Sequence, residues 1–233
     1  MNRQTTREIP ILDRVRELRE QLSTQGPQWQ RQPGDFVKVA FPRRDADLVR
    51  DLLIAEGVET VIEVGLAYGS SALAICEALL SSHAQKPKHI VIDPFQATSF
   101  SNVGSNLLMS VGLNELSRLI EKPSSVALPQ LVAEQTIADA AFIDGSHRFH
   151  EVLLDLYYLR KLLRPGGVVI LDDYCWPSVQ AAVRYFELNM KWKFLSEVSK
   201  ASSIDEASKL PRICALRLLD PTYEPPFEHF KSF

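Results

Sequence analysis

The residues of this sequence best suited to chemistry are acids and one histidine that follow short apolar runs. Glu63 lies in VIEV, Asp93 ends HIVID and Asp144 ends ADAAFID, while Asp172 and Asp173 together end VVILDD. Carboxylates at such places accept hydrogen bonds from hydroxyl groups and bind hard metal ions. Because the apolar runs have the length of buried strands, we expect these acids to mark strand ends.

A turn with two glycines follows Glu63 directly. The segment EVGLAYGSS has the spacing Glu-x-Gly-x-x-x-Gly, with Gly65 and Gly69. Glycine lets the backbone approach a ligand closely, and the helix expected from Ser70 onward begins with free N–H groups. The third glycine of a dinucleotide turn is missing, which argues against an NAD-dependent dehydrogenase. The acid at this position instead suits a ligand with an amino group, such as a nucleoside that carries an amino-acid tail.

The acid after the next strand suits a sugar. The carboxylate of Asp93 can accept hydrogen bonds from both hydroxyls of a ribose. Phe95, two residues further along, would then lie near a base ring. The alternative is that Asp93 caps a turn beside Pro94, which is a common role for aspartate.

The second group of candidate residues is Asp144 and His147, together with Asp172 and Asp173. Oxygen ligands of this kind suit Mg²⁺, and a metal ion here would hold two substrate oxygens and lower the pKa of a hydroxyl. His147 would take the proton, because imidazole titrates near neutral pH. However, neighbours on a regular strand point to opposite faces. Asp172 and Asp173 therefore reach one ion only if the strand has ended and the chain turns.

Alternating strands and helices must position these residues. The pattern predicts strands at 60–64, 89–92, 119–120, 138–143 and 168–171, and helices at 11–22, 45–56, 70–80, 107–111, 125–134, 150–163 and 179–189. Two late strands, 192–198 and 213–218, are expected to pair antiparallel across a polar loop. This order is typical of an α/β fold whose mainly parallel sheet has helices on both faces. Ligands in such folds bind beyond the carboxyl ends of the strands.

Four segments in this order resemble the class I S-adenosylmethionine-dependent methyltransferases: VIEVGLAYGSSALAI, IVIDPF, AAFIDGSHRFHEVLLDL and LLRPGGVVILDDY. The resemblance covers about residues 43–218. It implies a Rossmann-like sheet of seven mostly parallel strands with helices on both faces and a C-terminal antiparallel pair. It also implies the cofactor S-adenosylmethionine.

The resemblance further implies a role for each matching residue. Glu63 and the glycine turn would hold the methionine part of the cofactor, and Asp93 would bind the ribose. Ser124 or Ser125 would flank the adenine. The implied cofactor-binding residues are Glu63, Gly65, Tyr68, Gly69, Ser70, Asp93, Pro94, Phe95, Ser125 and Asp144.

Within this class, the second group of residues resembles metal-dependent O-methyltransferases that act on sugar hydroxyls of macrolide and aminocoumarin compounds. That resemblance implies Asp144, Asp172 and Asp173 as ligands of Mg²⁺. It also implies His147, with Asp144, as the catalytic groups.

The whole-chain numbers limit the other options. The 233 residues suffice for one large domain, and we expect a lead-in segment 1–42, a methyltransferase domain 43–220 and a tail 221–233. A net charge of −3 predicts neither a nucleic-acid nor a membrane partner. Three widely spaced cysteines and a polar start without an apolar leader are typical of a cytoplasmic protein. The apolar stripe in 11–22 packs on its own domain or permits a homodimer.

We therefore expect methyl transfer from S-adenosylmethionine to a hydroxyl of a small molecule, aided by a divalent metal. Two alternatives remain open at this point. One is a metal-independent methyltransferase that uses the same cofactor and whose acceptor is a nitrogen or a carboxylate. The other is a methyltransferase-like protein that binds cofactor or a partner without catalysis.

Overall fold

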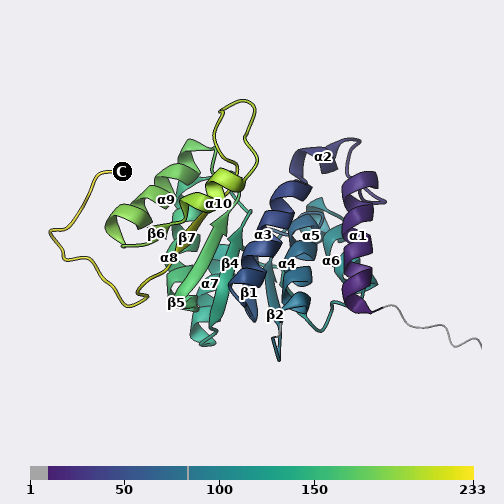
Figure 1. The fold of residues 1–233 in the computed structure, drawn as a ribbon, viewed down its shortest axis with the longest axis horizontal. Helices are drawn as coiled ribbons and strands as arrows, with labels where there is room; N and C mark the ends of the chain where they lie inside the picture. The colour runs from purple at the N-terminus through teal and green to yellow at the C-terminus, as the bar shows by residue number, and fades with distance from the viewer. Residues whose placement is uncertain (1–9, 83) are drawn as a thin grey trace, which may run out of the picture.

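A twisted sheet forms the centre of the molecule. The computed structural model describes residues 10–82 and 84–233, and within them seven strands form one sheet in the order β3-β2-β1-β4-β5-β7-β6 (Figure 1). The strands are β1 (Thr60–Val64), β2 (Lys88–Ile92), β3 (Ser117–Ile120), β4 (Ala138–Ile143), β5 (Leu163–Leu171), β6 (Lys193–Phe194) and β7 (Cys214–Arg217). Strands β1 to β5 are parallel, and β7 runs antiparallel to both β5 and β6. The predicted fold class is thereby confirmed.

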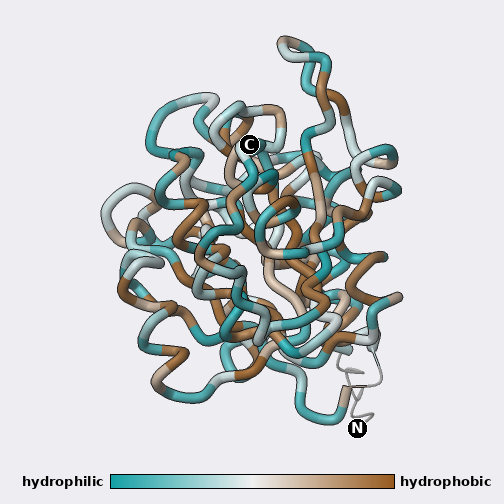
Figure 2. Tube along the Cα trace, turned by 90° about the vertical axis from the view of Figure 1, so that its left-hand side faces the viewer, coloured by the Kyte–Doolittle hydropathy of each residue, from teal (hydrophilic) through white to brown (hydrophobic). Residues whose placement is uncertain are grey.

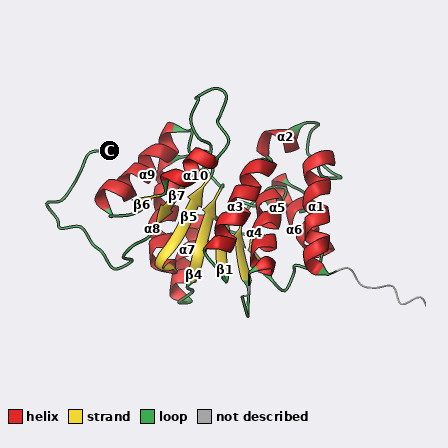
Figure 3. Cartoon of the chain, in the orientation of Figure 1, coloured by secondary structure: helices red, strands yellow, loops and turns green. Residues whose placement is uncertain are grey.

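Helices cover both faces of this sheet (Figure 3). They are α1 (Ile11–Gln25), α2 (Asp35–Val39), α3 (Arg43–Ala55), α4 (Ser70–Ser81), α5 (Gln96–Ser99), α6 (Val103–Ser110), α7 (Ser124–Ala133), α8 (Phe149–Leu162), α9 (Pro177–Asn189) and α10 (Ser196–Ala201). In β4, Ala141 and Ile143 pack with α7, α8 and α9, whereas Ala140 and Phe142 pack with α3 and α4. Both sides of the strand are therefore buried. Figure 2 shows hydrophobic stretches in the middle of the molecule.

The predicted elements differ from the observed ones mainly where an element is short. Helices α2, α5 and α10 were not predicted. The predicted strand 192–198 was wrong beyond residue 194, because β6 ends at Phe194 and α10 begins at Ser196 and continues into the expected polar loop. Helix α6 begins at Val103 rather than at 107. Four to six residues are too few to show a helical period, so the sequence pattern had no signal for these helices.

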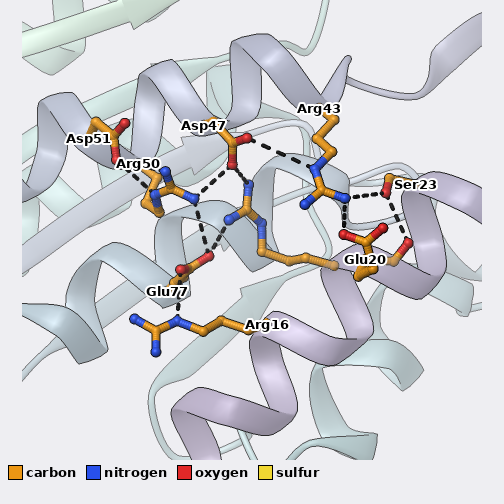
Figure 4. Close-up of polar contacts among 9 residues, drawn as sticks. Arg16, Glu20, Ser23, Arg43, Asp47, Arg50, Asp51 and Glu77 are labelled. Carbon is orange, nitrogen blue, oxygen red and sulfur yellow. Dashed lines mark hydrogen bonds and ion pairs between the residues drawn. The ribbon is translucent and has the colours of Figure 1, made fainter.

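The N-terminal helix α1 packs on its own domain. Val15 and Leu22 are buried in one cluster with residues of α4. Beside them an ion-pair network joins α1 to α3 and α4 (Figure 4). At its centre Glu77 on α4 lies 3.1 Å from Arg16 Nε and also accepts a hydrogen bond from Arg19. This intrachain packing buries Val15 and Leu22, whereas Ile11, Leu12 and Leu18 stay partly exposed, and the homodimer stays a prediction.

Two further expectations concerned the polar start of the chain and the absence of a membrane partner. The polar start, Met1 to Arg7, lies outside the described residues. None of the described helices combines the length and the apolar character needed to cross a bilayer.

Candidate active site

The predicted site residues follow strand residues that are aligned across the sheet. Val64 pairs with Ile92 on one side and with Ile143 on the other, and Ile143 pairs with Leu171. The residues that come next are Gly65, Asp93, Asp144 and Asp172. The parallel register therefore brings these four residues into one row at the carboxyl edge of the sheet.

Gly65 permits the close approach of β1 and β4 in this row. Its φ is +97°, and a Cβ atom at this position would lie 2.1 Å from the carbonyl oxygen of Asp144. No other amino acid fits, because both the backbone conformation and the space require glycine. Gly69 also has a positive φ, +87°, and directly precedes the first residue of α4. The N-terminus of α4 faces the same carboxyl edge of the sheet.

Glu63 is fully buried beneath the turn. One carboxylate oxygen accepts a hydrogen bond from Ser71 at the start of α4. The other lies 2.9 Å from Nε2 of His89 on β2, an ion-pair distance, although the angle is not that of a hydrogen bond. Burial opposes a charge on His89, but Cys76 and Glu63 outweigh it and raise the pKa of His89 to about 10. Glu63 thus joins strand, helix and neighbouring strand around the turn.

Asp93 holds the same turn from the other side. Its Oδ2 accepts hydrogen bonds from the amides of Leu66 and Ala67, both at 3.0 Å, and from the side chain of Gln96 at 2.9 Å. Its Oδ1 accepts one from the amide of Phe95 at 2.7 Å. The capping role weighed for Asp93 is therefore present, and its contact with ribose stays a prediction.

The remaining predicted cofactor residues differ in accessibility. Phe95 is 57% exposed and Ser125 is exposed, and the contact of each with the cofactor stays a prediction. Tyr68 is buried between the rings of Phe36 and Phe100. Tyr68 therefore supports the turn by packing.

Asp144, His147 and Asp173 form a cluster at the rim. Their ligand atoms all lie within 4.8 Å of one another. Nε2 of His147 is 2.6 Å from Oδ2 of Asp173, and this contact raises the pKa of His147 above its usual value. Burial, together with Asp172 and Asp173, raises the pKa of Asp144 well above the usual range. The ring of Trp176 lies over His147 at 5.4 Å between centroids.

Asp172 lies outside that cluster. Its side chain is fully buried, and its two oxygens accept hydrogen bonds from Nε and a terminal nitrogen of Arg212 at 2.8 and 2.7 Å. Asp173 diverges from it because its backbone is left-handed, with φ +54°. The chain does turn here, but the turn sends the two neighbouring carboxylates to different partners.

Comparisons with known proteins agree with this architecture. Residues 62–174 match a family model described as a methyltransferase domain. Residues 62–174 therefore carry a methyltransferase domain. The resemblance seen in the sequence is thus confirmed, and residues 62–174 contain nearly all of the predicted site.

Solved structures share the fold across nearly the whole methyltransferase chain. The O-methyltransferase of Bacillus cereus, solved with S-adenosylhomocysteine (SAH), has 16% identity and a TM-score of 0.63 over 92% of this chain and 93% of that one. The O-methyltransferase TomG of Streptomyces achromogenes, solved with S-adenosylmethionine, has 16% identity and a TM-score of 0.60 over 93% and 92%. A caffeoyl-CoA O-methyltransferase assigned in Staphylococcus aureus has 15% identity and 0.60 over 90% and 93%. No curated protein matches by sequence.

Sequence reasoning missed Arg212, although a signal for it existed. β7 was expected to be antiparallel, and Cys214 pairs with Leu171, the last residue of β5. A residue two positions before Cys214 must therefore lie near the carboxyl end of β5, beside Asp172. Trp176 had no comparable signal, because an aromatic residue in a loop is usually only packed.

The methyltransferase domain fits its cofactor better than it fits the predicted metal. The cradle of Gly65, the N-terminus of α4 and the exposed ring of Phe95 suit a nucleoside with an amino-acid tail. The predicted Mg²⁺ ligands Asp144, Asp172 and Asp173 are not assembled around one point, because Arg212 binds both oxygens of Asp172. The donor set that is assembled contains the imidazole of His147 instead.

Proposed function

We propose that this protein transfers a methyl group from S-adenosylmethionine to a hydroxyl group of a small molecule. The observation that carries the proposal is the ion pair of His147 and Asp173, at 2.6 Å, beside the same row of strand ends as the glycine turn. Two structural neighbours with known cofactor, from B. cereus and S. achromogenes, are O-methyltransferases solved with SAH or S-adenosylmethionine. A third neighbour is a TDP-rhamnose 3'-O-methyltransferase, which supports a hydroxyl as the acceptor.

The side chains at the rim would divide the work. When bound, the cofactor supplies a methyl group on a positively charged sulfur. Nε2 of His147 lies against Oδ2 of Asp173 in their ion pair, so Nδ1 is the ring nitrogen left to accept the proton of the acceptor hydroxyl. The Trp176 ring and Asp173 hold the imidazole in place, and such alignment of reacting groups is worth up to about 7–11 kcal/mol. Phe95 and Asp93 would flank the base and ribose.

Isothermal titration with S-adenosylmethionine and SAH tests the proposal. We expect one binding site per chain for each compound. If neither compound binds to the folded protein, the proposal is wrong. A panel of hydroxylated acceptors, with SAH release as the readout, then tests the hydroxyl as acceptor against amines and carboxylic acids.

Metal assistance is the second candidate, and one observation favours it. Asp144, His147 and Asp173 present their ligand atoms within 4.8 Å of one another. Two carboxylates and an imidazole suit a transition metal better than Mg²⁺. The engagement of Asp172 by Arg212 opposes it. Full activity after treatment with a chelator would exclude this candidate.

The non-catalytic alternative has less support. A protein that only binds cofactor or a partner has no need of an imidazole whose pKa is raised by a neighbouring carboxylate. Tight SAH binding combined with no turnover across a broad acceptor panel would nevertheless favour it.

A further inference from the structure

Arg212 is a guanidinium placed among the carboxylates of the rim. It makes a two-pronged ion pair with Asp172, and a terminal nitrogen lies 4.0 Å from Oδ1 of Asp173. The Arg212 side chain is 26% exposed, whereas that of Asp172 is fully buried. A planar guanidinium matches a carboxylate in this geometry and holds it firmly. Both oxygens of Asp172 therefore already have a cation.

We propose that Arg212 is the fixed cation of the acceptor site and that it keeps a divalent metal out by holding Asp172. The proposal deepens the proposed function, because it rests on the rim beside His147 being where the acceptor binds. Arg212 is thus a positioning residue that acts through Asp172 and Asp173.

The different directions of the Asp172 and Asp173 carboxylates explain how a metal ion is kept out. With Asp172 turned to Arg212, the left-handed backbone of Asp173 turns its carboxylate to His147, 2.6 Å away. A divalent ion bound by Asp144, His147 and Asp173 would have to stand next to the guanidinium, and like charges repel strongly at a partly buried site. It would also have to break the ion pair between His147 and Asp173.

The backbone around Arg212 holds the guanidinium in place. The Arg212 amide donates to the carbonyl of Ser203 at 2.9 Å, and the Arg212 carbonyl accepts from the amide of Tyr174 at 2.8 Å. Tyr174 follows Asp173 directly, so the segment before β7 and the segment after β5 are joined at this point. An acceptor oxygen that gives its proton to His147 would then have the positive charge of Arg212 nearby. In other enzymes a bound metal ion often supplies such a charge.

Manganese titration of the full-length protein, stripped with a chelator, tests the inference without an acceptor. Electron paramagnetic resonance measures the free Mn²⁺. We expect no saturable binding to the wild type. Arg212→Gln frees Asp172 and should gain saturable binding of one Mn²⁺, with an affinity about 10- to 100-fold above the upper limit that the titration sets for the wild type. Adding Asp172→Asn to Arg212→Gln should abolish that gain, which a merely structural role for Arg212 does not explain.

Arg217→Gln is the matched control. Arg217 lies on β7, shortly after Arg212, and also makes a two-pronged pair, with Glu56 at 2.7 and 2.6 Å. Its loss costs similar ion-pair energy without freeing Asp172, so Mn²⁺ binding should stay at the wild-type level. A Mn²⁺ site gained equally in both variants would overturn the inference.

Two further outcomes would also overturn it. One is saturable binding of one Mn²⁺ by the wild type, which decides the matter even if Arg212→Gln fails to fold. The other is a folded Arg212→Gln variant that binds no more Mn²⁺ than the wild type does. SAH titration of the same samples tests the proposed function separately, so failure of one is distinguishable from failure of the other.

Discussion

At the scale of single residues, the site differs from a simple ring of carboxylates. Several of the acids have partners of their own: Glu63 has Ser71 and His89, and Asp93 has the amides of the turn. The sequence correctly places such acids at strand ends, because strand periodicity and the parallel fold determine those positions. It could not show that Asp93 is occupied by backbone amides, because these contacts depend on the conformation of the turn.

The pKa of His147 gives the first test at this scale. The contact with Asp173 raises it above 6.5, so the imidazole in the folded protein loses its proton at a higher pH than a free histidine. The pair therefore adds stability below pH 6.5 that is lost as the pH rises through the folded pKa. In Asp173→Asn we expect the pKa to fall, as followed by NMR titration of labelled histidine. An unchanged His147 titration in this variant would contradict the pairing.

Asp155 on α8 gives the second test. Burial raises its pKa from 3.8 to about 7, and in the described residues its Oδ1 has no hydrogen-bond partner. The folded state thus binds a proton that the unfolded state releases, and the free energy of unfolding falls as pH rises from about 4 to 7. Asp155→Asn should raise stability at pH 8 by roughly 1–3 kcal/mol. Thermal melts at low pH, where Asp155 is neutral in both states, should show no such gain.

At the scale of elements, tight packing between strand ends creates the site. β1 and β4 approach each other at Gly65, and α1 is fastened to α4 through Glu77. The longer elements could be predicted because several turns of helix or a buried apolar run show a clear period. The helices of four to six residues could not, since tertiary contacts rather than periodicity determine them.

Gly65→Ala tests the approach of the two strands. The new methyl group would clash with the backbone of Asp144, so we expect a loss of roughly 2–3 kcal/mol or more and loss of SAH binding. Gly57→Ala is the matched control, because Gly57 also has positive φ, at +61°, but a Cβ added there would have no atom within 4 Å. It should cost only about 1–2 kcal/mol of strain and leave SAH binding intact. Equal effects in urea denaturation would refute this explanation.

Glu77→Gln tests the attachment of α1. The Glu77 side chain is 7% exposed and faces the guanidinium groups of Arg16 and Arg19. Removing this buried charge should cost roughly 3 kcal/mol and accelerate amide hydrogen exchange in α1. Glu20→Gln removes the 55% exposed partner of Arg43, and should change stability by less than about 1 kcal/mol. Unchanged exchange in α1 of Glu77→Gln would argue against the attachment.

At the scale of the whole molecule, the C-terminal tail crosses the outside of α8 and α9. Arg160 on α8 is only 3% exposed and donates to the carbonyl of Tyr223 and the carboxylate of Glu224. Asn189 on α9 exchanges two hydrogen bonds with the backbone of Lys231. The sequence indicated a separate tail, 221–233, but not that a buried arginine is paired with it.

Truncation tests this dependence. Removing residues 220–233 leaves the Arg160 guanidinium buried without its partners, and we expect a loss of roughly 3–5 kcal/mol in chemical denaturation. Removing only 227–233 keeps those partners and should cost less. Arg160→Met should stabilise the longer truncation while destabilising the full chain. Opposite signs of the stability change caused by Arg160→Met in the two chains are the decisive result. Equal signs would contradict the role of the tail.

The carboxylate of Asp93 links two parts of the molecule that would meet opposite ends of one ligand. It receives the amides of Leu66 and Ala67, on the side of the amino-acid tail, and that of Phe95, on the side of the nucleobase. A displacement of one segment is therefore transmitted to the other through a single anion. We infer that adenosine and methionine, offered as separate fragments, would not occupy their subsites independently, because ordering one segment lowers the entropic cost of ordering the other.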